Sequence, residues 1–369
     1  MVENDDKAEH PFPCIIAGGG TGGHLFPGIA VAREIERRVK RAQILFVVGL
    51  KRMESEILSG YGYRVAPIHV EGLKGRGLKR GVVVMLMLPK SLFQSFSILN
   101  AFSPRFVLGM GGYSAGPVCL AAKLKGIPTA IHEQNSYPGL TNRILSRSVD
   151  RVFISFEESR RHFKRGRLFL TGSPVREELF RDRAPERNGS RPFTILVMGG
   201  SQGAKAINDA FVGALFLLQG EGRSLHVIHQ TGEADHRRVM EMYRDKGLKG
   251  EVLPFIRDMA EAYENADLVV SRAGASTIFE LAALGKPSIL IPFPYAANQH
   301  QETNALALVR VGGAKMIRQD KLSPDHLAQT LAQYMDDREA LEQMGQSARK
   351  MARPNAAGAI VDHLLEMAG

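Results

Sequence analysis

Three glycine-rich segments carry the clearest chemical signal in this sequence. They occupy residues 18–24 (GGGTGGH), 109–116 (GMGGYSAG) and 199–204 (GGSQGA). Glycine lets a backbone turn tightly and approach a ligand closely, and the N–H groups at the start of a following helix attract phosphate. A single loop of this kind often serves only as a tight turn between a strand and a helix. Three of them, each directly after an expected strand, predict that two anionic groups are bound in one cleft.

The first loop also fits the GxGxxG pattern of dinucleotide-binding proteins, through Gly18, Gly20 and Gly23. Such a protein has an acidic residue about 20 positions further on, at the end of the second strand, to hold the ribose. The expected second strand ends in residues 47–50 (VVGL), without a carboxylate. In the third loop Ser201 takes the place of the second glycine. A nicotinamide-dependent oxidoreductase is therefore the weaker interpretation.

Polar side chains lie at two expected helix starts. His24 lies where the first loop becomes a helix, and the positive end of the helix dipole favours a neutral imidazole that can accept a proton. It could equally cap the helix or bind a phosphate. Thr277 and Glu280 have the spacing of a capping box that opens a helix ending near Gly285. His132, inside an expected strand, is interpreted as a buried residue with satisfied hydrogen bonds.

The elements that must position these residues are strands and helices in alternation. Short apolar runs alternate with stretches of helical periodicity, which is typical of βα units around a parallel sheet. Strands are expected at residues 14–17, 44–48, 106–108, 129–132 and 152–154, and again at 194–198, 225–229, 251–253, 268–271 and 288–291. Each half is therefore predicted to form an open α/β sheet, with residues 171–192 as the hinge. The carboxyl ends of both strand sets should face a shared cleft.

The composition is that of a globular protein with an anionic partner. The chain has 369 residues, of which 44% are hydrophobic and 23% charged, and this suits roughly two domains. A net charge of +10 favours nucleic acid, a phosphate-bearing ligand or an anionic bilayer as partner. The chain has no Trp, no RNP-like string and no CxxC or HxxxH pattern, so no nucleic-acid partner is expected.

The amino terminus and the cysteines favour a cytoplasmic protein. Residues 1–13 are acidic at Asp5 and Asp6 and lack the basic start and apolar core of a secretion signal. Cys14 and Cys119 are too few for a disulfide framework and too far apart for a redox or zinc pair. Both are predicted to be small buried hydrophobic residues.

Five segments closely resemble the MurG family of N-acetylglucosaminyltransferases: residues 20–24 (GTGGH), 132–135 (HEQN), 199–204 (GGSQGA), 272–275 (RAGA) and 300–305 (HQETNA). The likeness runs from about Pro13 to about Ala314 in the family's order and spacing. One departure is Ser173, where Asn would be expected. The resemblance implies a GT-B architecture, with two Rossmann-like α/β domains whose parallel sheets face a central cleft. It implies inverting transfer of N-acetylglucosamine from UDP-N-acetylglucosamine to the muramoyl 4-hydroxyl of lipid I, giving lipid II for peptidoglycan synthesis, without metal or cofactor.

The resemblance also implies a distribution of sites over two domains. Residues 1–172 would bind the acceptor and the membrane, and residues 173–369 the UDP-sugar, with the last helix able to pack back on the first domain. His24 would be the catalytic residue, with Glu280 on the ribose hydroxyls and the backbone of Ile256 on the uracil edge. The implied donor-binding residues are Thr21, Gly22, Gly23, Asn135, Arg176, Ser201, Ile256, Ala275, Ser276, Thr277, Ile278, Phe279, Glu280 and Gln301, and the acceptor-binding residues are Gly111, Gly112, Tyr113 and Ser114.

A basic and apolar segment is predicted to attach the protein to a membrane. Lys74, Arg76, Lys79 and Arg80 precede the apolar run of residues 82–88, which is followed by Pro89. This run is far short of the roughly 20 residues that span a bilayer, and a core helix flanked by charge is the alternative. Because a polyprenyl-linked acceptor stays in the bilayer, we expect peripheral, salt-sensitive binding at the cytoplasmic face of the cell membrane. The contacts would come from these four basic residues with Val83 and Leu86.

Other functions remain open at this point. A related lipid or sterol glycosyltransferase is the nearest alternative, because one two-domain scaffold serves many acceptors. The oxidoreductase above and a catalytically inactive sugar-nucleotide sensor are more distant.

Overall fold

The computed structural model describes residues 11–19, 22–50, 52–70, 77–163, 167–180 and 192–369, with residues 77–87 described by their helical backbone alone. The chain divides into two compact units, and each is described by itself below. The first, which we call the N-unit, comprises Met1–Arg176 and Arg353–Gly369; the second, the C-unit, comprises Glu177–Ala352. The division thus falls after Arg176, and the last helix of the chain belongs to the N-unit.

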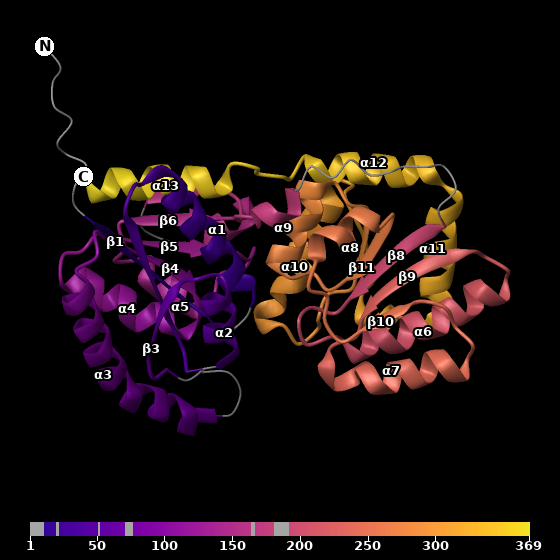
Figure 1. Cartoon of the computed structure of the whole chain (residues 1–369), viewed down its shortest axis with the longest axis horizontal. Helices are drawn as coiled ribbons and strands as arrows, with labels where there is room; N and C mark the ends of the chain where they lie inside the picture. The colour runs from indigo at the N-terminus through magenta and orange to yellow at the C-terminus, as the bar shows by residue number, and fades with distance from the viewer. Residues whose placement is uncertain (1–10, 20–21, 51, 71–76, 164–166, 181–191) are drawn as a thin grey trace, which may run out of the picture. The chain divides into compact units, whose positions relative to one another are not determined.

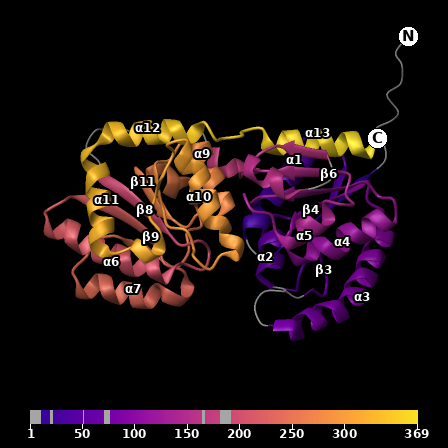
Figure 2. The same ribbon diagram turned by 180° about the vertical axis from the view of Figure 1, so that it is seen from behind.

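The N-unit is built on a parallel sheet of seven strands in the order β3-β2-β1-β4-β5-β6-β7. Helices cover both faces of this sheet (Figures 1 and 2). Ile29 and Ile360 pack on one face, and Leu99 and Val118 pack on the other. Its elements are β1 (Phe12–Gly18), α1 (Gly22–Arg38), β2 (Ala42–Val48), α2 (Arg52–Gly60), β3 (Arg64–Pro67), α3 (Gly77–Phe102), β4 (Phe106–Gly111), α4 (Gly112–Leu124), β5 (Thr129–Glu133), α5 (Leu140–Leu145), β6 (Arg151–Ile154), the 3-10 turn η2 (Glu157–His162), β7 (Arg167–Leu170) and α13 (Ala356–Ala368).

The C-unit is built on a parallel sheet of six strands in the order β10-β9-β8-β11-β12-β13. Its core lies between the sheet and three helices, through residues such as Phe211, Tyr243 and Leu327. Its elements are η3 (Glu177–Phe180), β8 (Phe193–Met198), α6 (Lys205–Gly220), β9 (Leu225–Gln230), α7 (Glu233–Asp245), β10 (Glu251–Leu253), α8 (Met259–Asn265), β11 (Leu268–Ser271), α9 (Ala275–Leu284), β12 (Ser288–Leu290), η4 (Ala297–Gln299), α10 (His300–Arg310), β13 (Lys315–Met316), η5 (Gln319–Lys321), α11 (Pro324–Asp336) and α12 (Arg338–Arg349).

All the strands expected from the sequence are present, and the prediction of two parallel-sheet α/β units is confirmed. Both cysteines are buried, also as predicted. The sheets contain three further strands, β3, β7 and β13, and each lies at an edge of its sheet. These strands are partly exposed. Strands β3 and β13 lack a run of large apolar residues, which is why the sequence did not reveal them, whereas β7 has a short one at residues 168–170 that the sequence analysis did not assign.

The predicted capping box at Thr277 is wrong. Helix α9 begins at Ala275, and its N-cap is Gly274 in an extended conformation. The N–H of Ile278 already donates to the carbonyl oxygen of Gly274, at 3.0 Å. Thr277 therefore lies inside the first turn, where it cannot act as the N-cap. The end of the helix is as predicted, because Gly285 adopts the left-handed conformation with φ 63°.

Candidate functional site

The first two glycine-rich loops of the N-unit pack directly against each other. They follow β1 and β4, which are neighbouring strands of the sheet. Gly112 has φ +77°, and a Cβ atom there would lie 2.2 Å from the carbonyl oxygen of Gly19. A Cβ on Gly111 would lie 3.0 Å from ring atoms of His24. Glycine is thus required here for the close approach of two backbones and an imidazole ring.

His24 lies in the first turn of α1 and is half-buried. Its Nδ1 atom is 2.9 Å from Oε1 of Gln134, a buried residue that follows β5. Among the described residues, no hydrogen bond involves Nε2 of His24. Within the described part of the chain, one nitrogen of the ring is thus held by the protein and the other is open to a ligand.

Gln134 connects His24 to a second histidine. Its Nε2 atom donates to the carbonyl oxygen of Met110 and lies 2.9 Å from Nδ1 of His132. On the other side of that ring, Nε2 lies 3.0 Å from the carbonyl oxygen of Gly172. Burial lowers the pKa of His132 to about 4, so this ring is neutral. The prediction of a buried, hydrogen-bonded His132 is confirmed.

Glu133 organises the loop that carries Asn135. The Glu133 carboxylate is buried and accepts hydrogen bonds from the backbone N–H groups of Asn135 and Gly139. It also accepts from the side-chain amides of Asn135 and Asn142. A buried carboxylate is tolerated only when its oxygens are satisfied in this way. The loop after β5 is thereby fixed, and Asn135 is held half-buried within it.

The other predicted residues of the N-unit lie near the starts of α1 and α4. The guanidinium carbon of Arg176 is 4.4 Å from the ring centroid of Phe26, in the second turn of α1. Tyr113 and Ser114 lie in the first turn of α4, where Ser114 is buried and Tyr113 is half-buried. Thr21, Lys74 and Arg76 lie outside the described residues, and so do the side chains of Lys79, Arg80, Val83 and Leu86 in α3.

In the C-unit the third glycine-rich loop packs against the turn that follows β9. Gly203 has φ +73°, and a Cβ atom there would lie 1.8 Å from the carbonyl oxygen of Thr231. The side-chain amide of Gln230 donates to the carbonyl oxygen of Gly200 at 3.1 Å. Ser201 is exposed at the tip of this loop, before α6 begins at Lys205.

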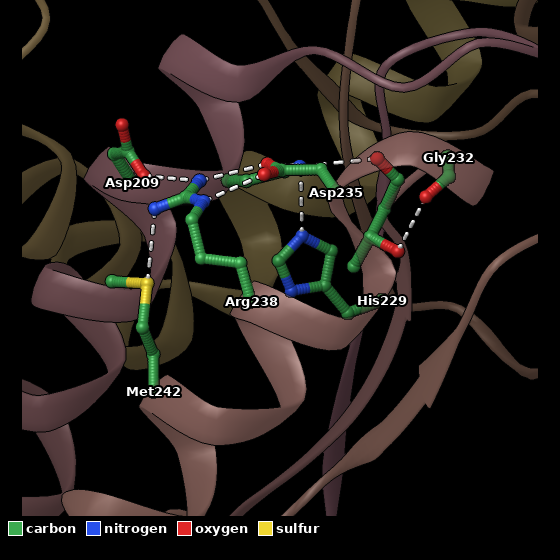
Figure 3. A network of polar contacts seen from close by, with 8 residues as sticks. Asp209, His229, Gly232, Asp235, Arg238 and Met242 are labelled. Atoms are coloured by element: carbon green, nitrogen blue, oxygen red, sulfur yellow. Dashed lines mark hydrogen bonds and ion pairs between the residues drawn. The ribbon is translucent and has the colours of Figure 1, made fainter.

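A network that includes charged side chains lies beside this turn (Figure 3). Asn208 donates to the carbonyl oxygen of Thr231 and to the carboxylate of Asp235. Arg238 donates to Asp235 and forms an ion pair of 2.6 Å with Asp209. The hydrogen bonds from Arg238 hold the pKa of Asp235 below its usual value. The turn is thus fixed by full charges, and the sequence analysis did not identify these residues.

His229, which also belongs to this network, is neutral. It is buried, and burial lowers its pKa to about 3. Its Nε2 atom lies 3.2 Å from Oδ1 of Asn208, and its Nδ1 atom lies 3.0 Å from the hydroxyl of Tyr243.

The start of α9 combines small residues with a buried carboxylate. Ser276 and Thr277 are half-buried in its first turn, while Ala275, Ile278 and Phe279 are buried. Glu280 is only 7% exposed, and one of its oxygens accepts a hydrogen bond of 3.0 Å from the hydroxyl of Tyr263. Ile256 is buried as well, which agrees with its predicted apolar environment.

Arg272, at the end of β11, is the main residue of this region that the sequence analysis did not assign to a site. Its guanidinium donates to the carbonyl oxygens of Ile291 and Pro292 and to Oε1 of Gln319. Burial lowers its pKa to about 10, so it stays charged at neutral pH. No carboxylate of a described residue pairs with it. Arg272 thus places positive charge beside the loop after β12.

Gln301 fixes the same loop from α10. Its Oε1 atom accepts a hydrogen bond of 2.9 Å from the backbone N–H of Phe293. The Phe293 ring in turn lies under the guanidinium of Arg272, 5.4 Å from centroid to carbon. Arg272 and Gln301, which belong to two of the sequence segments singled out above, therefore meet at one loop. Among the described residues, no group of three or more His, Cys, Asp or Glu side chains is placed to hold a metal ion.

Comparison with known proteins assigns both halves of the chain to one family. The model for the glycosyltransferase family 28 N-terminal domain matches residues 14–154, and the model for the C-terminal domain of that family matches residues 194–360.

Individual relatives match over nearly their whole length. A protein of Syntrophus aciditrophicus is 46% identical over 96% of this chain and 98% of its own length. One of Myxococcus xanthus is 45% identical over 96% of this chain and 92% of its own length. Both are described as UDP-N-acetylglucosamine--N-acetylmuramyl-(pentapeptide) pyrophosphoryl-undecaprenol N-acetylglucosamine transferase.

Solved structures agree with this relationship. The crystal structure of Acinetobacter baumannii MurG has a TM-score of 0.77 and 33% identity, and the match covers 96% of this chain and 100% of that one. The glycosyltransferase of kitacinnamycin has a TM-score of 0.69 over 96% of this chain and 100% of its own, but its 17% identity shows a common fold only.

Proposed function

The chain belongs to glycosyltransferase family 28, and we propose that it transfers N-acetylglucosamine from UDP-N-acetylglucosamine to lipid I, giving lipid II for peptidoglycan synthesis. The observation that carries this proposal is the match of 46% identity across 96% of the chain to a protein described with that activity. Lipid I is the undecaprenyl-diphosphate-linked N-acetylmuramyl pentapeptide, so donor and acceptor each contain a diphosphate. The tightly packed glycine-rich loops of both units suit such ligands.

In this reaction the muramoyl 4-hydroxyl oxygen bonds to C1 of N-acetylglucosamine while the bond from C1 to the diphosphate oxygen breaks. The configuration at C1 is inverted, and UDP leaves with the electron pair. The hydroxyl proton must pass to a base. His24 fits this role, because its Nε2 atom makes no hydrogen bond to a described residue. A positioned base typically contributes about a hundred- to ten-thousand-fold in rate.

On this proposal the C-unit holds the donor. The amino terminus of α9 and the amides of the third glycine-rich loop would stabilise the negative charge on the leaving UDP. Ser201, Ala275–Phe279 and Gln301 would surround the nucleotide, with Glu280 on the ribose hydroxyls and the backbone of Ile256 on the uracil. Gly22, Gly23, Asn135 and Arg176 would complete the donor contacts from the N-unit. Gly111, Gly112, Tyr113 and Ser114 would bind the acceptor.

One assay tests the proposed function. The purified protein is incubated with UDP-N-acetylglucosamine and a soluble lipid I analogue, and UDP release and the mass of the product are followed. We expect UDP release that depends on the acceptor, and a product that has gained one N-acetylglucosamine. A sterol serves as the matched control acceptor. Release that is equally fast without acceptor, or with the sterol, would contradict the proposal.

We also propose that the N-unit binds peripherally to an anionic membrane at the cytoplasmic face, because the polyprenyl chain of the acceptor stays in the bilayer. No helix within the described part of the chain is long and apolar enough to cross a bilayer. The described part of α3 exposes Phe93 at 75%, beside the exposed Lys90. Helix α5 exposes Leu140 and Ile144, which lie four residues apart on one helical face. Exposed apolar side chains with nearby basic residues favour a surface of this kind.

The membrane proposal predicts salt-sensitive binding through Lys74, Arg76, Lys79 and Arg80, with Val83 and Leu86 adding apolar contact. Each basic residue near an anionic surface contributes about 1 kcal/mol. Changing all four to Ser should therefore abolish co-sedimentation with anionic vesicles while activity on a short-chain acceptor is kept. A matched control changes four exposed basic residues of the C-unit to Ser, namely Arg237, Arg244, Lys246 and Lys249. Equal vesicle binding by the two variants would contradict the proposal.

A further inference from the structure

The hydrogen bonds around Gln134 begin and end at backbone carbonyl oxygens. Met110, in β4, provides one of these oxygens, 2.9 Å from Nε2 of Gln134. Gly172 provides the other, 3.0 Å from Nε2 of His132. A carbonyl oxygen can only accept a hydrogen bond, whereas an amide or an imidazole can do either. The two carbonyls therefore determine the direction of every hydrogen bond between them.

The Met110 oxygen fixes the orientation of the Gln134 amide. The group that faces this oxygen must be the NH2 group, so the amide oxygen must face His24. This conclusion rests on donor and acceptor chemistry and not on which amide atom is drawn as nitrogen.

The Gly172 oxygen leads independently to the same orientation. It requires a proton on Nε2 of His132, and the hydroxyl oxygen of Ser155, 3.3 Å from the same nitrogen, can accept a hydrogen bond from that proton as well. Because His132 is buried and neutral, its Nδ1 atom then has only a lone pair, and its neighbour Gln134 must donate to it. The NH2 group of Gln134 thus meets both Met110 and His132, and its oxygen meets Nδ1 of His24 at 2.9 Å.

We propose that Gln134 is a positioning residue that holds neutral His24 in the tautomer protonated on Nδ1, so that the lone pair of Nε2 is free to take the proton of the attacking sugar hydroxyl. This inference rests on the proposed function, in which His24 is the base. The amide oxygen accepts a hydrogen bond from Nδ1–H. Because Nδ1 carries the proton of the neutral ring, the lone pair of the ring lies on Nε2. In catalytic triads, a carboxylate holds the histidine in the required tautomer and orientation. A neutral amide orients the ring without placing a negative charge beside it.

The tautomer can be read directly by nitrogen NMR on the full chain labelled with ¹⁵N-histidine. His24→Ala identifies the His24 signals by their loss. At alkaline pH, where the imidazole is neutral, we expect the proton of wild-type His24 on Nδ1. In Gln134→Leu it should move wholly or partly to Nε2. A wild-type His24 protonated on Nε2, or an unchanged tautomer in Gln134→Leu, would overturn the proposal.

A double-mutant cycle separates positioning from simple packing. Gln134→Leu should lower kcat by about ten- to a hundredfold, a part of the full effect of the base. The double variant His24→Ala/Gln134→Leu should turn over no more slowly than His24→Ala alone, because Gln134 acts only through His24. If the two effects multiply instead, Gln134 supports the fold and the proposal is wrong.

A stability control completes the test. Ile35→Ala removes a fully buried side chain from α1, the helix that carries His24, without touching Gln134. At a comparable loss of Tm, Ile35→Ala should keep its kcat within about twofold of wild type. A kcat that simply follows Tm in both variants would reject the positioning role. Failure of the proposed function is distinguishable from these results, because a wild-type protein inactive on the lipid I analogue would still report its tautomer by NMR.

Discussion

The N-unit and the C-unit each pack a glycine-rich loop against a neighbouring backbone, but they support it with different chemistry. Gly112 meets Gly19 in the N-unit, and Gly203 meets Thr231 in the C-unit. Behind the first contact, hydrogen bonds through the uncharged amide of Gln134 join His24 to His132. Behind the second lie full charges, with Arg238 between Asp209 and Asp235.

This difference matches the work proposed for each unit. In the N-unit, the uncharged amide of Gln134 orients the ring of the proposed base by a hydrogen bond and not by an ion pair. Binding a diphosphate instead requires positive charge and rigidly held backbone N–H donors. In the C-unit, Arg272 would supply such charge, because it is buried and charged and has backbone carbonyl groups as partners. On this proposal, the same strand–loop–helix arrangement serves proton transfer in one unit and anion binding in the other, and the side chains that pack behind the loop make the difference.

The largest expected effect concerns the base. His24→Ala should lower kcat by about a hundred- to ten-thousand-fold, because the proton of the attacking hydroxyl loses its acceptor. Steady-state turnover with the lipid I analogue measures this. His326→Ala, which removes an exposed histidine of the C-unit, is the control and should keep wild-type turnover. Unchanged turnover of His24→Ala would show that the hydrogen-bonded network around Gln134 does not serve catalysis.

The next effect concerns stability in acid, and it should be shared by both units. The pKa of His132 is lowered by burial from 6.5 to about 4, and that of His229 from 6.5 to about 3. A depressed pKa gives stability that is complete above about pH 6.5 and is lost as the pH falls toward the folded-state value, because only the unfolded chain binds the proton. Each histidine should cost about 3 kcal/mol of unfolding free energy between about pH 6.5 and pH 4.

Denaturant unfolding at a series of pH values checks this expectation. Asp235 adds no loss over most of this range, because its pKa lies below the usual value. A free energy of unfolding that stays constant down to about pH 4.5 would mean that these histidines are not neutral and buried as described.

A smaller effect is expected at the ribose. Glu280→Gln keeps an oxygen that can accept from Tyr263, so Tm should not change, but it loses the charge that strengthens hydrogen bonds to a diol. The affinity for UDP should fall by roughly five- to thirtyfold, which corresponds to about 1–2 kcal/mol. Tyr263→Phe is the matched control, because it removes the hydrogen bond to Glu280 but keeps the carboxylate, and it should leave UDP affinity nearly unchanged. Calorimetric titration with UDP measures both. Equal affinity of Glu280→Gln and wild type would remove Glu280 from the donor site.

The smallest effect concerns the opening of α9. Because Thr277 is not the N-cap, Thr277→Ala should change the free energy of unfolding by less than about 0.5 kcal/mol while UDP binding weakens. Ser323 of α11 is a true N-cap that accepts from the N–H of His326. Ser323→Ala should therefore cost about 1 kcal/mol of stability and leave UDP binding intact. The reverse pattern, with Thr277→Ala the less stable variant, would show that the start of α9 is built for the helix and not for a ligand.

The sequence predicted the central strands well, because strands buried on both faces have continuous apolar runs. It also predicted the buried state of His132 and Ile256. The hydrogen bonds that Gln134 makes with His24 and His132 could not be predicted in the same way, although Gln134 lies within a segment that was singled out. Met110, which accepts from Gln134, and Gly172, which accepts from His132, are far away in the chain and become neighbours through the order of the strands β4, β5, β6 and β7. A local sequence pattern does not specify the order of the strands in a sheet.

The charged groups of the C-unit were missed for a related reason. Arg238 and Asp235 look like an ordinary ion pair on a helix surface, and their function appears only once Asn208 links Asp235 to the turn at Thr231. Arg272 lies in one of the segments that carry the family resemblance, but the sequence analysis assigned it no role. Its burial and its carbonyl partners depend on the loop after β12, which a local pattern cannot place.

Two measurements test most directly whether the two units have separate roles. They are the single-turnover rate at saturating UDP-N-acetylglucosamine and the affinity for UDP, and both are made on His24→Ala and on Glu280→Gln. We predict that His24→Ala loses single-turnover rate by at least about a hundredfold and keeps UDP affinity within about twofold. Glu280→Gln should lose UDP affinity and keep its single-turnover rate within about twofold. If both variants lose rate and affinity together, the two units do not have separate roles, and the account is contradicted.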